Sequence, residues 1–399
     1  MISSRLRTLV PVLATVVTLF LSPLPGPLAG QSLLSTQGLG FPLEPLDARS
    51  RALGSMGLGL SGAALLPTDP AAAAGLRIPT VNISVQPLWG EGDLEGEGLE
   101  SRSTRFPLMG LAYPVSELRG MVTLTFGGFM DQRWEVEEER TLSLGDTTTQ
   151  VTDIFKSDGG VSAVRIGWSQ RLRDNLSVGV NVGTHTGSVR RTFIRSFDSL
   201  AVREGIQPFR DGGKWQFSGL TGSVGVNWNP STLLRVAGSV TWSGDLDAEP
   251  GDDTKGEAAT FALPLQLRVG ASGLLTPRLI LHLSASRSDW GENDNGLQGQ
   301  AVEGPVWGFG GGVEWEGPTW GARNFPLRLG YRYTELPFLF QGAEPSETAF
   351  TAGLGLNLTR AENLILAGMD LGVERGERDA GILSETFWRG TVTFRVAGW

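Results

Sequence analysis

An apolar residue at every second position is the feature that most constrains how this chain can fold, and it recurs from about residue 80 to the end. In 176–183, for example, Leu176, Val178, Val180 and Val182 alternate with small or polar residues. Such alternation predicts β-strands with one apolar and one polar face. Fourteen segments show it, at about 80–87, 104–112, 120–130, 160–170, 176–190, 214–228, 232–243, 260–272, 278–289, 305–316, 325–335, 347–358, 364–375 and 385–396.

The connections between these segments alternate between short and long. The short ones contain turn-forming Asn, Asp or Pro and lie at 173–175, 229–231, 276–277 and 360–363. The long ones lie at 88–103, 131–159, 191–213, 244–259, 290–304, 336–346 and 376–384. This order is typical of a transmembrane barrel with short periplasmic turns and long outer loops. A soluble sandwich or propeller, the alternative, predicts mixed loop lengths.

A β-structure crosses lipid only as a closed barrel, because every backbone polar group must find a partner there. We therefore predict an all-β fold, a 14-stranded antiparallel transmembrane β-barrel over residues 80–399. Tryptophans near the strand ends are expected to form an aromatic girdle at the membrane boundary. They are Trp168, Trp228, Trp242, Trp290, Trp307 and Trp388.

Residues 1–30 have the pattern of a secretory signal peptide. Arg5 and Arg7 precede an apolar stretch at 8–21, and the small residues Ala29 and Gly30 offer a cleavage site. The stretch is too short for a retained helical anchor. We expect Sec-type export to the outer membrane of a Gram-negative cell, with outer-membrane lipid and lipopolysaccharide as partners.

The composition excludes several function classes. With no Cys and only 2 His, the chain has no thiol catalyst and no cysteine-ligated metal site. The net charge of −9 argues against a nucleic-acid partner. His185 and His282 fall on the inward phase, so a phospholipase-like Ser–His pair stays open, but we expect no enzyme and no cofactor. The acidic loops at 245–253 and 289–294 lack EF-hand spacing, so we expect no metal site, with calcium as the alternative.

The inward positions of the predicted strands are mostly small, many of them Gly, so a barrel of this size leaves space inside. The segment 31–79 is too apolar for a solvated tail and is predicted to plug this space. A periplasmic arm is the alternative. The plug residues that we expect to fill the barrel interior are Leu53, Met56, Leu58, Leu60, Asp69 and Pro70.

Many arginines also lie at the alternate strand positions that are predicted to face the barrel interior. Arginine binds carboxylates in a bidentate manner and keeps its charge, so these residues indicate a path for an anionic amphiphile. Alternatively, they pair with acids of the plug, such as Glu44, Asp47 and Asp69. The arginines are Arg165, Arg171, Arg235, Arg268, Arg328, Arg332, Arg389 and Arg395.

Apolar residues in the outer loops are expected to form an entry surface for a hydrophobic molecule. They are Leu336, Phe338, Leu339 and Phe340. The same side chains would alternatively lie at the lipid boundary.

The run ARSRALGSMG at 48–57, followed by GAA at 62–64 and Asp69-Pro70-Ala71, resembles the start of FadL-type and PorV-type outer-membrane proteins. Those families show an ARALGMGGA run and an Asn-Pro-Ala turn before the first strand. This chain has Asp69 in place of that Asn. The resemblance implies a fourteen-strand barrel with an N-terminal hatch. In FadL relatives, long-chain fatty acids or aromatic hydrocarbons leave sideways through a kink in a wall strand.

Two hypotheses follow for function. The first is a porin-like channel for passive uptake of hydrophobic or amphipathic small molecules, such as long-chain fatty acids or aromatic hydrocarbons. The second follows from PorV-type relatives and is a surface barrel that docks secreted proteins without transporting a small molecule.

Overall fold

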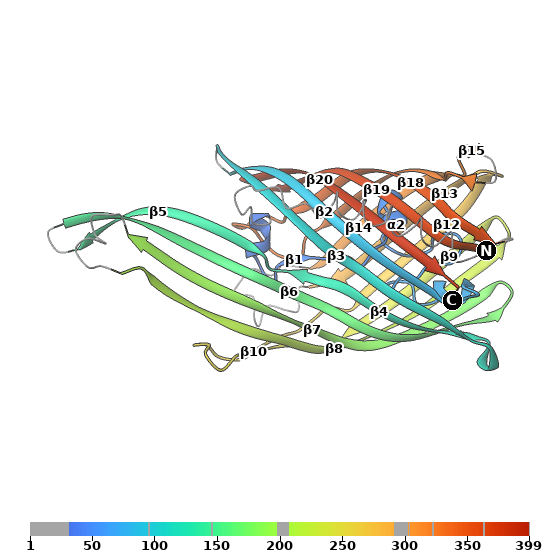
Figure 1. Cartoon of the computed structure of the whole chain (residues 1–399), viewed down its shortest axis with the longest axis horizontal. Coiled ribbons are helices and arrows are strands. Elements are labelled where there is room, and N and C mark those ends of the chain that lie inside the picture. The colour runs from blue at the N-terminus through green and yellow to red at the C-terminus, as the bar shows by residue number, and fades with distance from the viewer. Residues whose placement is uncertain are drawn as a thin grey trace, which may run out of the picture.

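The computed structural model describes residues 32–94, 96–144, 147–197, 207–290, 302, 304–320, 323–361 and 364–398. The predicted signal peptide, residues 1–30, lies outside the described residues. Fourteen strands form a closed antiparallel barrel, as predicted (Figure 1). They are β2 (Thr80–Leu94), β3 (Glu97–Val115), β4 (Gly120–Asp131), β6 (Thr147–Arg173), β7 (Leu176–Phe197), β8 (Phe209–Ser231), β9 (Leu234–Ser243), β12 (Gln266–Thr276), β13 (Leu279–Asp289), β14 (Pro305–Trp315), β17 (Leu327–Glu335), β18 (Ser346–Ala361), β19 (Leu364–Ala380) and β20 (Leu383–Ala397).

The barrel closes where the first and last of these strands meet. β20 pairs with β2 from Thr80↔Ala397 to Leu94↔Leu383. The outer wall is apolar, and Leu220 and Leu329 are 65% and 63% exposed. Exposed apolar side chains around a closed barrel are what a lipid environment requires. None of the helices in the described part of the chain is long and apolar enough to cross a membrane.

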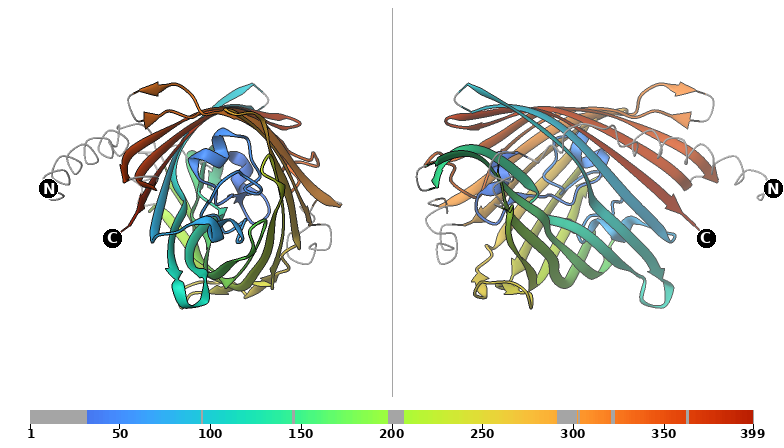
Figure 2. Two further views of the ribbon diagram at one scale, coloured as in Figure 1. Left: turned by 90° about the vertical axis from the view of Figure 1, so that its right-hand side faces the viewer. Right: turned by 60° about the vertical axis from the view of Figure 1, so that its left-hand side comes forward.

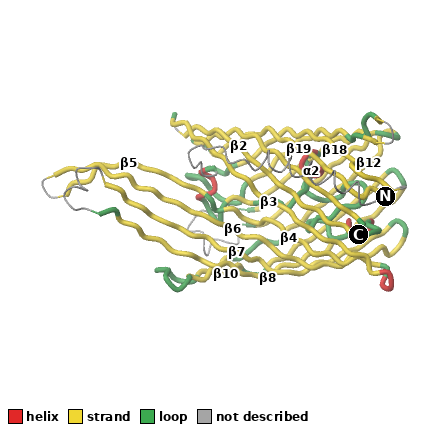
Figure 3. The backbone as a smooth tube through the Cα atoms, viewed as in Figure 1, coloured by secondary structure: helices red, strands yellow, loops and turns green. Residues whose placement is uncertain are grey.

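Several predicted outer loops are largely continuations of strands. β5 (Trp134–Leu144) pairs with the outer half of β6. Together with β7 and β8 these strands project well beyond the rest of the barrel (Figures 1 and 3). A sheet that is surrounded by water needs no apolar face, so apolar alternation does not mark these extensions in the sequence.

The predicted strand at 260–272 is divided. Its first part forms β11 (Ala259–Phe261), which pairs with β10 (Leu246–Pro250), and β12 begins only at Gln266. Pro264 lies between them and has no N–H to donate to a ladder. A further small hairpin, β15 (Thr319–Trp320) and β16 (Arg323–Asn324), lies between β14 and β17.

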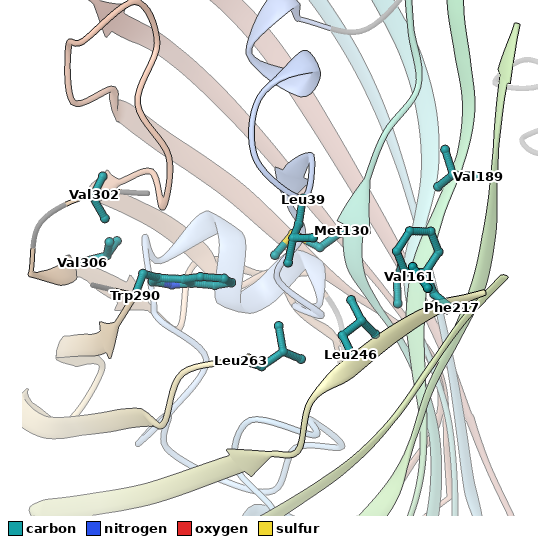
Figure 4. Packing of buried hydrophobic residues seen from close by; sticks show 11 residues of the cluster. Leu39, Met130, Val161, Val189, Phe217, Leu246, Leu263, Trp290, Val302 and Val306 are labelled. Atoms are coloured by element: carbon teal, nitrogen blue, oxygen red, sulfur yellow. The ribbon is translucent and has the colours of Figure 1, made fainter. Parts of the chain in front are cut away.

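The predicted tryptophan girdle is correct for most of its members but wrong for Trp290. Trp228, Trp242 and Trp388 are about half exposed on the wall, Trp307 is 37% exposed, and Trp168 is half-buried. Trp290 is instead buried in an internal cluster with Leu39, Met130 and other apolar residues (Figure 4). It directly follows β13, and there its indole packs inward instead of facing lipid.

Residues 32–79 lie within the barrel (Figure 2), and we call them the inner segment. The inner segment contains η1 (Leu33–Thr36), β1 (Phe41–Pro42), α2 (Ala48–Ala52) and η2 (Ala72–Gly75). Asp47 caps α2, since its carboxylate accepts from Ser50 N at 2.7 Å. Its elements are short because its glycines, such as Gly54 at φ +61°, repeatedly turn the backbone.

Candidate functional site

The inward glycines of the wall allow the inner segment to approach very closely. A Cβ placed at Gly310 would lie 1.7 Å from the carbonyl oxygen of Gly54. A Cβ at Gly179 would lie 2.2 Å from the carbonyl oxygen of Pro70, and one at Gly270 would lie 2.4 Å from that of Leu58. The space that these glycines leave is therefore occupied by backbone of the inner segment.

The six predicted plug residues are all buried in this contact. Leu53 and Leu60 pack with Leu66 and with Leu108 of β3. Met56 and Leu58 are fully buried, and Asp69 and Pro70 lie against β7 and β8. The wall also donates hydrogen bonds to carbonyl groups of the inner segment. They run from Ser272 to Gly59 (2.6 Å), Thr351 to Ala52 (2.8 Å), Ser239 to Thr68 (2.9 Å) and Asn181 to Pro67 (3.0 Å).

Asp69 is the buried polar centre of the second half of the inner segment. Its carboxylate accepts from Ala72 N at 3.1 Å, from Gly59 N at 3.3 Å and from Asn227 Nδ2 at 3.0 Å. Burial raises the pKa of Asp69, although Arg235 and these hydrogen bonds oppose that effect. The residue thus ties together two turns of the inner segment and strand β8.

Three of the predicted arginines belong to ion-pair networks. Arg332 contacts Glu44 of the inner segment at 2.5 Å, and Arg389 contacts Glu347 at 2.8 Å. Burial opposes ionisation of Glu44, but Arg332, Arg51 and Arg268 hold its pKa below the usual value. Arg328 pairs with Glu314 at 2.6 Å and with Asp370 at 2.7 Å. Glu44 was predicted as a partner. The following network members were not predicted as ion-pair partners: the wall acids Glu314, Glu347, Glu374 and Glu385 and the arginines Arg49, Arg51 and Arg378.

The other five predicted arginines are separate from these networks. Arg171 is exposed at the periplasmic end, and Arg395 is half-buried near Gly368. Arg235 donates to Gly62 O at 2.6 Å. Arg165 and Arg268 both border an internal cavity.

This cavity lies on the extracellular side of the inner segment and measures about 130 Å³. Phe41, Phe129 and Trp290 supply aromatic surface, whereas the charged groups at its border include Arg165, Arg268, Glu44, Glu335 and Glu347. A concave site that is lined by apolar groups and a few polar groups is typical of small-molecule binding.

The predicted loop entry surface is not open in this structure. Leu336, Phe338 and Phe340 are buried against Leu34, Phe41 and Leu383, and Leu339 packs on the internal cluster around Trp290. The loop folds inward because the apolar start of the inner segment offers it a partner that water does not. Leu336 also borders the cavity.

The wall itself has a gap beside the cavity. Pairing of β3 with β4 ends at Leu108↔Gly127. Beyond that point β1 of the inner segment takes the free edge of β4, through Phe41↔Asp131 and Pro42↔Met130. Phe129 of β4 also lacks a partner in β6, which marks a bulge between Gly128 and Met130.

Charged groups bridge the same gap. Arg105 of β3 contacts Asp131 of β4 at 2.9 Å, and Arg133 contacts the same carboxylate at 2.8 Å. The gap is therefore closed by β1 and by one ionic bridge rather than by a continuous ladder. The place of this gap was not predicted, because side-chain alternation does not reveal where neighbouring strands separate.

Both histidines are buried in hydrogen-bonded positions. His282 Nε2 lies 2.9 Å from Ser55 Oγ of the inner segment, and its Nδ1 lies 3.2 Å from Ser272 Oγ. His185 Nε2 lies 3.2 Å from Ser243 Oγ, and its ring is tilted by 45° against that of Phe129, with ring centroids 4.4 Å apart. No carboxylate is hydrogen-bonded to either ring among the described residues, and no cluster there fits a metal ion. The Ser–His contact thus joins the inner segment to the wall.

Comparison with known proteins supports the architecture. Residues 175–357 match the family model of the outer membrane protein beta-barrel domain. The toluene transporter TbuX of Ralstonia pickettii is 14% identical, with a TM-score of 0.57 over 90% of this chain and 99% of that chain. The toluene transporter TodX of Pseudomonas putida is 13% identical, with a TM-score of 0.58 over 89% of this chain and 99% of that chain. A FadL homologue of Pseudomonas aeruginosa is 11% identical, with a TM-score of 0.56 over 90% of this chain and 99% of that chain.

No curated protein matches the chain in sequence. The structural likeness shows that the fold is that of FadL-type barrels, as the resemblance at 48–71 implied. The domain match, together with the apolar outer wall, shows that the chain is an outer membrane barrel.

Proposed function

We propose that this outer membrane barrel, which has the FadL-type fold, is a channel for passive uptake of hydrophobic or amphipathic small molecules. The observation that carries the proposal is the cavity on the outer side of the inner segment, where Phe41, Phe129 and Trp290 meet Arg165 and Arg268. Such a mixture suits a ligand with an apolar body and one polar end. The structural neighbours include proteins described as toluene transporters, and the same kind of cargo is proposed here.

In this proposal, the inner segment is the plug. It is bound to the wall mainly by hydrogen bonds from single side chains and by ion pairs such as Arg332–Glu44. Only β1, two residues long, is part of a barrel ladder. The segment is therefore able to shift without breaking the barrel, whose fourteen strands pair with one another independently of it.

The gap between β3 and β4 supports a sideways exit. It adjoins the cavity, since Phe41, Arg105 and Phe129 border both. Withdrawal of β1 and breakage of the Arg105–Asp131 pair would join the cavity to the lipid. A hydrophobic cargo gains free energy by leaving into lipid rather than into water.

Uptake by whole cells tests the function. A host with a lipopolysaccharide-bearing outer membrane is given labelled toluene or hexadecanoate, with and without the protein, at concentrations that limit growth. We expect faster uptake of at least one of the two in the cells that carry the protein, and equal uptake of a labelled sugar. Equal uptake of all three compounds, with the protein folded in the outer membrane, would contradict the proposal.

A further inference from the structure

Two arginines at the cavity lack a carboxylate within 4 Å in the described part of the chain. Arg165 Nη2 donates a long hydrogen bond of 3.4 Å to Thr221 Oγ1, and Arg268 Nη1 donates to Gln266 Oε1 at 3.1 Å. The Nε atoms of both side chains are buried without a partner, and Arg165 as a whole is only 8% exposed. A buried cation without a counter-charge is costly, so these groups favour an anion beside them.

The two guanidinium groups are also electrostatic neighbours. Arg268 repels the charge on Arg165. The carboxylate that attracts the charge of Arg268 is that of Glu44. Glu44, however, already contacts Arg332 at 2.5 Å and Arg51 at 3.5 Å. The charge of Glu44 is therefore shared among several cations, and neither Arg165 nor Arg268 has a carboxylate of its own in the described part of the chain.

The cavity also limits the shape of the ligand. Its volume of about 130 Å³ is close to that of a buried apolar cavity of roughly 150 Å³ that holds benzene. Phe41, Phe129 and Trp290 line it, and aromatic rings pack favourably against one another. A single aromatic ring therefore matches this space better than a long acyl chain does.

We propose that the cavity binds a small aromatic monocarboxylate such as benzoate, with the carboxylate between Arg165 and Arg268 and the ring among the aromatic side chains. Arginine suits this role because its planar donor groups bind a carboxylate in a bidentate manner. The inference rests on the proposed function, since it names the cargo class of the same channel.

Calorimetric binding to the purified full barrel in detergent tests the inference with three probes. Benzoate has the ring and the charge, toluene has the ring alone, and hexadecanoate has the charge on a long chain. The variants are Arg165→Gln and Arg268→Gln, and the matched control is Arg173→Gln, an exposed arginine near the turn between β6 and β7. A shift of the unheated band in gel electrophoresis shows that each variant is folded.

We expect benzoate to bind most tightly and to lose about tenfold or more in affinity in either cavity variant, as the loss of a charged hydrogen bond implies. Toluene affinity is expected to stay unchanged in the variants, and the control to match the wild type. Equal or tighter binding of toluene or hexadecanoate, unaffected by the two substitutions, would overturn the inference while leaving the proposed function intact. Absence of binding of all three probes, combined with unchanged cellular uptake, would overturn both.

Discussion

At the scale of single residues, strand parity predicts which side of the wall a side chain faces but not which partner it meets. Arg328, Arg332 and Arg389 do face inward and are buried, as the phase indicates. Their partners Glu314 and Glu347 share that phase, yet they were not recognised. Which side chains of neighbouring strands meet depends on the register between those strands, and the register cannot be read from the sequence of one chain.

Glu347 is the acid whose loss we expect to be most damaging to the barrel. It is 3% exposed and contacts both Arg378, at 2.9 Å, and Arg389, at 2.8 Å. Glu347→Gln leaves two buried guanidinium groups without that charge, and the free energy of unfolding should fall by about 3 kcal/mol. Reversible urea unfolding in detergent measures the change.

The matched control for this prediction is Glu377→Gln, because Glu377 is an exposed acid on the neighbouring strand β19. This substitution should change the free energy of unfolding by no more than about 0.5 kcal/mol. A loss in Glu347→Gln no larger than that of the control would show that the network around Arg389 does not stabilise the fold.

At the scale of elements, the wall strands were predictable and the inner segment was predictable only as a unit. Alternation located all fourteen wall strands because lipid outside and small or polar groups inside impose it on each of them. The inner segment has no such two-sided environment. Its short elements α2 and β1 depend on contacts with the wall, and β1 exists only because β4 offers a free edge.

Gly310 of β14 is expected to control how well the inner segment is seated. A Cβ there would lie 1.7 Å from Gly54 O, whereas a Cβ at Gly273 of β12 would meet nothing within 4 Å. Gly310→Ala should therefore push the inner segment away from the wall, and Gly273→Ala should not. Single-channel conductance for small ions and protease cleavage within 32–79 should both rise in the first variant only. Equal behaviour of the two variants would show that this close approach does not hold the segment in place.

Acid should loosen the same segment through Glu44. The pKa of Glu44 is held below its usual 4.5, so its ionised form contributes stability that is complete above pH 4.5 and is lost as the pH falls through the lowered pKa. The protection factors for hydrogen exchange within 32–79, which are corrected for the intrinsic exchange rate at each pH, should fall in that acidic range in the wild type. Glu44→Gln should exchange faster already at neutral pH and should respond less to acid. An acid response that is the same in the wild type and in Glu44→Gln would assign the effect to other groups.

At the scale of the whole molecule, the barrel is a closed ring whose ladder is interrupted beside the cavity. All fourteen wall strands pair in sequence around the ring, yet β3 and β4 separate above Leu108↔Gly127. There the wall is completed by β1 and by the Arg105–Asp131 pair instead of a ladder between β3 and β4. We therefore expect β1 to separate from β4 during transport.

A reversible lock on β1 tests this expectation most directly. Pro42 and Met130 are opposite residues of β1 and β4, and residues paired in this way lie at a spacing that a disulfide can bridge. The chain has no native Cys, so Pro42→Cys with Met130→Cys introduces the single pair of thiols. The control pair, Thr348→Cys with Glu377→Cys, joins the neighbouring strands β18 and β19 of the wall. We predict that oxidation of the first pair stops uptake of the cargo, that reduction restores it, and that the control pair transports in both states. Undiminished uptake with the first disulfide fully formed would contradict the account.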